Sequence, residues 1–278
     1  MAAEPPDAEP AEPAEPAEPA EAAERGSRGI QSVEVGGQLL LALLRLGRAL
    51  PLKTLAAEAG MTAAKAHPYL VSFGKLGLIA QDEATGHYGI GPLALQLGLV
   101  AQQQLDPVRV AGEALPALAA ELGHTTALAV WGPQGPTMVR IETPPTPIHV
   151  VMRPGTVMSL AGTASGLLFA AHRPRGQVRA LFDAERARGA PGARIDFAQF
   201  ERQLAEVRLQ GLATVADTLV PGINAMAAPV FDPWGELALS LTVIGPSATL
   251  DMAPQGAPAE LLRAAARAAS QRLGSPRR

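Results

Sequence analysis

Apolar residues recur at helical spacing in residues 35–59 and predict two short helices. The first has its apolar positions at i, i+4, i+7, i+8 and i+11, and Gly47 lies where this helix should stop. Pro51 can open the second helix, and Gly60 after it supplies a left-handed turn. The two apolar faces consist of Val35, Leu39, Ala42, Leu43 and Leu46, and of Leu52, Leu55, Ala56 and Ala59.

A third helix and a hairpin follow directly. Thr62 is a suitable N-cap, and Ala66, Leu70 and Phe73 form one face that should pack on the two preceding helices. Residues 78–80 and 87–90 predict two strands around a turn at residues 82–86. Three helices closed by a hairpin are typical of a winged helix-turn-helix, a motif that places one helix in the major groove of DNA.

The solvent face of the third helix is the candidate DNA-reading surface. Its small side chains would let the helix approach base edges, and Lys65 could reach a phosphate or a guanine. Pro68 lacks a backbone donor and should cost about 3 kcal/mol inside a helix, which predicts a kink at residues 64–68 or a displaced first turn. The residues predicted to contact DNA are Thr62, Ala63, Ala64, Lys65, His67, Tyr69, Ser72 and, in the wing, His87.

The rest of the chain mixes helical and strand patterns. Helices are predicted over residues 93–104, 108–122, 163–172, 197–209 and 259–273. Strands are predicted in two antiparallel pairs, 126–131 with 137–142 and 225–231 with 237–244. Strands and helices without a βαβ repeat indicate an α+β domain with an antiparallel sheet.

Charge is distributed unevenly along the chain. Eight of the 26 acidic side chains and none of the 23 basic ones lie in residues 1–24, so the remaining residues carry a net charge of +5. This segment contains four Ala-Glu-Pro triplets, a composition that cannot bury enough apolar surface to fold. We expect residues 1–29 to be a disordered solubilising arm. The alternative is a decoy that competes with DNA for the basic surface of the protein.

The composition excludes several kinds of chemistry. The chain has no cysteine, which rules out disulfides, thiolate zinc sites and cysteine nucleophiles. It contains no G-x-S-x-G, P-loop, G-x-G-x-x-G or H-E-x-x-H motif, and no two of its five histidines are spaced i, i+3 or i+4. No apolar run approaches the roughly 20 residues of a membrane span. We therefore expect no catalytic residue, metal or cofactor, and a cytoplasmic location.

Five blocks between residues 30 and 273 resemble, in order, the IclR family of bacterial transcriptional regulators. The segments SVEVGGQLLLALL (32–44), PLKTLAAEAGMTAAKAHPYLVSFGKLGLI (51–79) and GHYGIGPLALQLG (86–98) are similar to its first helix, helix-turn-helix, and wing with linker helix. MSLAGTASGLLFAA (158–171) and GINAMAAPVFDPWGELALSLTVIGP (222–246) resemble parts of its effector domain. The chain departs from the family at three positions. Pro68 stands where the family commonly has a basic residue, Ala161 stands where it has a histidine, and Asp217 stands alone where it often has two adjacent acidic residues.

The resemblance implies a GAF-like second domain that binds a small effector between its sheet and loops. The family's effector contacts correspond here to Ala164, Ser165, Val215, Ile223, Ala225, Thr242 and Ile244. This set is mostly apolar, and a helix N-terminus near Thr163 favours anions. We therefore expect an effector with a hydrophobic or aromatic body and one carboxylate. The alternative is that these residues form the core of a ligand-free dimerisation domain.

Together the patterns predict a sequence-specific DNA-binding regulator that is controlled by a small organic effector. We expect a homodimer or a dimer of dimers on a near-palindromic operator, with the linker helix in the dimer contact, as the resemblance implies. The alternative is a small-molecule sensor whose degenerate winged helix docks a protein partner, which Pro68 and a net charge of only +1 over residues 30–90 would favour. The predicted segments are a tail (1–29), a DNA-binding domain (30–91), a linker helix (92–104), an effector-binding and oligomerisation domain (105–273) and a short tail (274–278).

Overall fold

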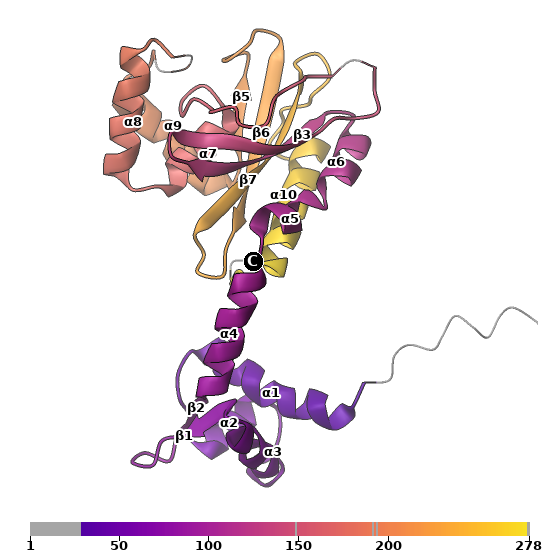
Figure 1. Ribbon diagram of the computed structural model, residues 1–278, viewed down its shortest axis with the longest axis vertical. Helices are drawn as coiled ribbons and strands as arrows, with labels where there is room; N and C mark the ends of the chain where they lie inside the picture. Colours follow the sequence, from indigo (N-terminus) through magenta and orange to yellow (C-terminus); the bar gives the residue numbers. More distant parts are fainter. Residues whose placement is uncertain (1–28, 148, 191, 193, 277–278) are drawn as a thin grey trace, which may run out of the picture. The chain divides into compact units, whose positions relative to one another are not determined.

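The computed structural model describes residues 29–147, 149–190, 192 and 194–276 (Figure 1). The described residues divide between residues 103 and 104 into two compact units, each with its own hydrophobic core. The acidic arm predicted at the N-terminus lies, apart from Gly29, outside the described residues. In the part of the chain that the structure describes, no helix is both long and apolar enough to span a bilayer.

The first unit is a three-helix domain with a hairpin, as predicted. Gly47 ends the first helix in the left-handed conformation, with φ of 61°. The hairpin pairs Ile79 with Ile90, and Leu50 bridges to Tyr88 beside it, which ties the segment before the second helix to the wing. The elements are α1 (Gln31–Leu46), α2 (Leu52–Glu58), α3 (Ala63–Leu76), β1 (Ile79–Gln81), β2 (Tyr88–Ile90) and α4 (Pro92–Gln104), of which the last is the predicted linker helix.

Pro68 does not interrupt α3. The first turn of the helix is in place, because the Ala66 N–H donates to the Thr62 carbonyl at 2.9 Å. The carbonyl that loses its partner to Pro68 is that of Ala64, which lies on the exposed face, where water can satisfy it. The predicted displacement of the first turn is therefore wrong, and α3 runs as one span over residues 63–76.

The second unit is built on a five-stranded antiparallel sheet. Its strand order is β4-β3-β7-β6-β5, so the two predicted hairpins pair with each other through β3 and β7. This confirms the predicted α+β class. The strands are β3 (Thr125–Gly132), β4 (Gly135–Glu142), β5 (Ala213–Ala216), β6 (Ile223–Phe231) and β7 (Leu237–Pro246).

Helices cover both faces of this sheet (Figure 1). Because side chains alternate along a strand, Ser240, Thr242 and Ile244 of β7 face one helical layer, and Leu241 and Val243 face the other. The first layer is α7 (Ala164–His172), α8 (Arg175–Ala187) and α9 (Phe197–Gln210). The second layer is α5 (Pro107–Gly112), α6 (Leu115–Leu122) and α10 (Ala257–Arg272).

Three sequence predictions for this unit need correction. The single helix expected over residues 108–122 is broken into α5 and α6 at residues 113–114, because Pro116 lacks the N–H that a continuous helix would need there. Helix α8 was missed although apolar and charged residues alternate along it at helical spacing, with Val178 and Phe182 on its buried face. Strand β5 was missed because it has four residues and depends on pairing with β6.

Candidate DNA interface and effector cavity

In the N-terminal half of α3, the side chains of Lys65 and His67 make no hydrogen bond or ion pair with another described residue. Both are exposed, and the small residue Ala64 lies beside them. The Lys65 backbone N–H donates to the Thr62 hydroxyl at 3.3 Å, which fixes the start of the helix and therefore the direction of the lysine. The face thus presents one cation and one imidazole over a flat, small-residue surface.

The other predicted DNA contacts have partners within the domain. Thr62 acts as the N-cap of α3, and the Ser72 hydroxyl donates to the Pro68 carbonyl at 3.0 Å. The Tyr69 ring packs on α1, since a Cβ at Gly36 would lie 2.7 Å from Tyr69 Cδ1. Ala63 is partly buried against the core of the unit. The structure therefore narrows the side chains available for base reading.

The wing turn is held by one carboxylate. Asp82 accepts hydrogen bonds from the backbone N–H groups of Ala84 at 2.9 Å and Thr85 at 2.8 Å. These bonds, with that of Thr85 contributing most, hold the pKa of Asp82 below its ordinary value. His87 follows this turn, is half-buried, and lies just before β2. The wing therefore has a defined shape before any DNA is present.

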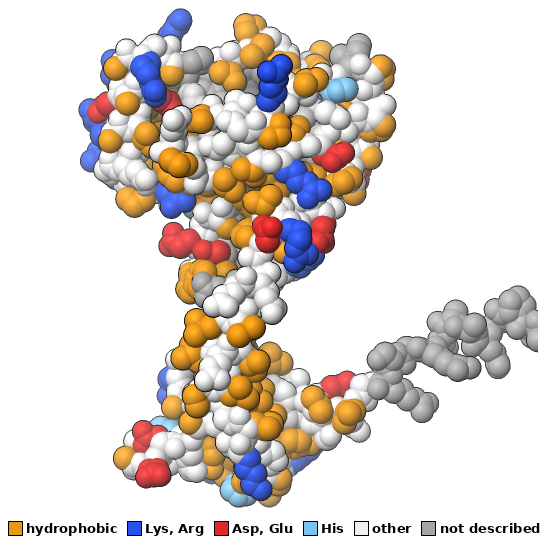
Figure 2. All heavy atoms as spheres, viewed as in Figure 1, with side chains coloured by type: hydrophobic (Ala, Val, Ile, Leu, Met, Phe, Trp, Pro, Cys, Tyr) orange, Lys and Arg blue, Asp and Glu red, His pale blue; other side chains and the backbone are white. Residues whose placement is uncertain are grey.

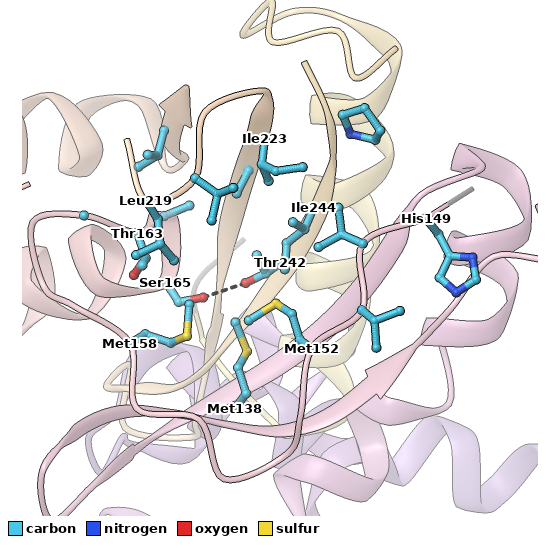
Figure 3. A pocket seen from close by; sticks show the side chains of 18 residues that line it. Met138, His149, Met152, Met158, Thr163, Ser165, Leu219, Ile223, Thr242 and Ile244 are labelled. Atoms are coloured by element: carbon cyan, nitrogen blue, oxygen red, sulfur yellow. Dashed lines mark hydrogen bonds between the residues drawn. The ribbon is translucent and has the colours of Figure 1, made fainter. Parts of the chain in front are cut away.

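All seven residues predicted to contact an effector line one cavity of about 430 Å³ in the second unit (Figure 3). They come from α7 (Ala164 and Ser165) and from β5, β6 and β7, which are far apart in sequence. Several residues on this face of the sheet are alanines, whose short side chains leave room for a cavity above the strands. The lining also includes Thr163, at the predicted anion-favouring helix start, and residues that the sequence did not indicate, namely Met138, His149, Val150, Val151, Met152, Met158, Gly162, Leu219, Val220 and Pro246.

Buried hydroxyls form the polar part of the cavity floor. Ser165 Oγ lies 2.8 Å from Thr242 Oγ1 and accepts a hydrogen bond from Ser240 Oγ at 3.0 Å. Ser165 and Thr242 are each 1% exposed, and Ser240 is fully buried. Because the three hydroxyls satisfy one another, no bound ligand is needed to keep them buried. Ser165 lies in the first turn of α7, and its hydroxyl is bonded to the hydroxyls of Ser240 and Thr242.

Three methionines converge on the same cavity. Figure 3 shows the sulfur atoms of Met138, Met152 and Met158 on one side of the pocket, facing the Ser165–Thr242 pair. Met138 and Met158 come together because the segment after β4 returns along that strand, with the Met158 N–H donating to the Pro136 carbonyl at 2.7 Å. No periodic pattern in residues 143–162 signals this return. Flexible thioethers make a wall that adapts to a ligand and makes favourable contacts with aromatic rings.

The start of α7 is held rigidly at the cavity. Thr163 Oγ1 caps the helix by accepting from the Gly166 N–H at 3.0 Å. The buried Glu185 carboxylate accepts from the Leu160 N–H at 2.9 Å and so anchors the chain just before the helix. Gly166 allows a close approach, since a Cβ there would lie 2.0 Å from the Ser159 carbonyl oxygen. Residues 162–165 therefore present the N-terminal end of a fixed helix to the cavity.

Asp217 has a structural role at the mouth of the cavity. It has a φ of 54°, which is unusual for a residue with a side chain. Its Oδ1 accepts from the Gly222 N–H at 2.6 Å, so it closes the loop 217–222. That loop carries Leu219 and Val220, which line the cavity, whereas Asp217 is absent from the lining. Asp217, at the place where the resembling family has an acidic pair, thus shapes the site without lining it.

Two family models match the chain in the order of its two units. The "IclR helix-turn-helix domain" matches residues 32–83, and "Bacterial transcriptional regulator IclR C-terminal" matches residues 100–271. The chain belongs to the IclR family. This confirms the resemblance and the fold that it implied. The two matches leave out the acidic N-terminal segment.

Matches to bacterial regulators cover 82% to 90% of this IclR-family chain. The "Glycerol operon regulatory protein" of Streptomyces griseus is 31% identical over 255 residues, which are 89% of this chain and 98% of that protein. The "HTH-type transcriptional regulator BhcR" of Paracoccus denitrificans is 27% identical over 82% of each chain. The crystal structure of Pseudomonas aeruginosa HmgR has 38% identity and a TM-score of 0.83, and the match covers 90% of this chain and all of that one. This IclR-family protein is a DNA-binding transcriptional regulator.

Proposed function

We propose that α3 reads an operator through its exposed N-terminal half, with Lys65 as the main cationic contact. Lys65 is exposed and lies next to the small residue Ala64. This supports the assignment, because a lysine among small side chains can reach a phosphate or the edge of a guanine. His67 and the wing residue His87 add contacts on either side. Thr62 and Ser72 contribute through the acceptor capacity of their hydroxyls, and Tyr69 and Ala63 position the helix.

A mobility-shift experiment tests this assignment. The probe is the promoter DNA beside the protein's own gene, titrated with non-specific competitor at two salt concentrations. Lys65→Glu should lower operator affinity by about tenfold or more, because it removes one cation and adds a repelling charge. The matched control is Lys75→Glu in the last turn of α3, about 15 Å further along the helix, with the same change of charge. Equal effects of the two substitutions would contradict the placement of the reading surface.

We propose that the effector is a carboxylic acid with a hydrophobic or aromatic body, bound in the cavity of the second unit. The volume of about 430 Å³ and the largely apolar lining suit such a body. The N-terminal end of α7 suits the carboxylate, because its first backbone N–H groups have no helical partner and the helix dipole favours an anion. The Ser165 and Thr242 hydroxyl oxygens keep acceptor capacity for a donor group on the ligand.

Thermal-shift and calorimetric titrations with benzoate, phenylacetate and short-chain fatty acids test the effector site. A binding acid should raise the unfolding temperature of the intact chain and change its affinity for the operator. Ala225→Leu should abolish that binding by filling the cavity, whereas the control Ala225→Ser leaves the space open and should retain it. Binding that survives Ala225→Leu would move the site elsewhere.

We further propose that the regulator is a homodimer, or a dimer of dimers. Leu95, Leu97, Leu99 and Val100 of α4 are each at least half exposed, an arrangement that water does not favour. Figure 2 shows hydrophobic side chains gathered over α1 and α4. A second copy of the chain would cover these residues, and a two-fold axis would match a near-palindromic operator. Light scattering should give a multiple of the 28.7 kDa chain mass, and Leu97→Glu should reduce it.

A further inference from the structure

A second cavity of about 590 Å³ lies next to the effector cavity and shares two of its wall residues. Val215 of β5 and Leu219 of the 217–222 loop line both spaces. The second cavity is otherwise different in character, since Arg194, Gln203, Thr214 and Thr218 line it. We call it the side chamber.

The polar groups of the side chamber suit an anion. Arg194 is the one charged side chain among the described residues that line it, and no lining residue is acidic. Gln203 and the two threonines supply neutral donors beside the guanidinium. A guanidinium with neighbouring neutral donors is the usual protein arrangement for binding a carboxylate.

Ala161 leaves the side chamber open. It lines this chamber and not the effector cavity, and it is the position at which the resembling family has a histidine. An imidazole there would project from a residue that is 6% exposed into the space that is now empty. Gly192 lies against the same peptide, because a Cβ at Gly192 would lie 2.5 Å from the Ala161 carbonyl oxygen. The chamber is thus tied to the segment that leads into α7.

We propose that the effector is a dicarboxylate, with its apolar body in the effector cavity and a second carboxylate in the side chamber against Arg194. This rests on the proposed effector site and extends it. Because both cavities share Val215 and Leu219, the proposed ligand would have to pass these two side chains to reach from one space into the other. In this arrangement Ala161 and Arg194 make the protein bind a dicarboxylate more tightly than the corresponding monocarboxylate.

Calorimetric titration of the intact chain with matched pairs of acids tests the proposal. The pairs are phenylacetate with 4-carboxyphenylacetate, and 3-phenylpropionate with 3-(4-carboxyphenyl)propionate. At least one dicarboxylate should bind about tenfold more tightly than its monocarboxylate, as one added charged hydrogen-bonded pair implies. Arg194→Gln and Ala161→His should each remove that gain and leave the monocarboxylate affinity unchanged, whereas Ala161→Gly should preserve it.

The outcomes separate this inference from the proposed function. If the monocarboxylates bind and the dicarboxylates gain nothing, or if the gain survives Arg194→Gln, the side chamber is not part of the site and the effector cavity stands. If no acid of either kind binds, both the effector site and the side chamber are overturned. Arg194 is exposed, so its substitution should leave the fold intact and keep the test valid even if Ala161→His is unstable.

Discussion

The buried hydroxyl cluster under the effector cavity permits a quantitative test of the structure. Thr242→Val keeps the side-chain volume and removes one hydroxyl, while Ser165 retains the bond from Ser240 at 3.0 Å. We expect a loss of about 1 kcal/mol in the free energy of unfolding. Ser165→Ala removes both short bonds and leaves Ser240 and Thr242 with only their 3.3 Å contact, so we expect a loss of about 2 kcal/mol.

The double variant measures the coupling between these groups. Both substitutions break the same Ser165–Thr242 bond, so the double variant should lose about 1 kcal/mol less than the sum of the two single losses. Urea unfolding of the intact chain followed by tryptophan fluorescence is suitable, because Trp131 and Trp234 are the only tryptophans and both lie in the second unit. Strict additivity, within about 0.3 kcal/mol, would refute the shared bond.

Three further predictions follow from local geometry. Gly166→Ala should cost at least about 2 kcal/mol in thermal or urea unfolding, because its Cβ would clash with the Ser159 carbonyl, whereas the control Gly176→Ala in α8 meets no atom within 4 Å and should be neutral or stabilising. Asp217→Asn should retain phenylacetate binding because asparagine tolerates φ of 54° and keeps an acceptor, whereas Asp217→Val should weaken it, and equal titration curves for the two would contradict this role of the loop. The folded-state pKa of Asp82 lies below its ordinary value of 3.8. The Asp82 carboxylate therefore stabilises the wing fully above that pH, and this stabilisation is lost as the pH falls through the lowered pKa. A midpoint at or above 3.8 in an NMR titration of the Thr85 amide would contradict this role of Asp82.

Local signals in the sequence were sufficient for most of the first unit. Gly47 ends α1, Thr62 caps α3, and the apolar spacing of Leu39, Leu43 and Leu70 places these residues in the core. These features depend on the backbone preferences of single residues and on the burial of one face of each helix. Both are determined by residues that are close together in the sequence. The same reasoning predicted that Pro68 could displace the first turn of α3. The turn is in place, and the exposed Ala64 carbonyl, which loses its helical partner, can accept a hydrogen bond from water instead.

Family resemblance, and not a physical pattern, located the seven effector-cavity residues in the sequence. The resemblance was enough to list the chemistry of these seven residues, but not to predict the cavity that brings them together. Only the tertiary structure showed that the segment after β4 returns Met158 to Met138, that β5 forms an edge strand, and that Ala161 opens a second chamber. The physical reason is that a cavity is the space left by segments distant in the chain. Its shape depends on how they pack against one another, which no local spacing of residues records.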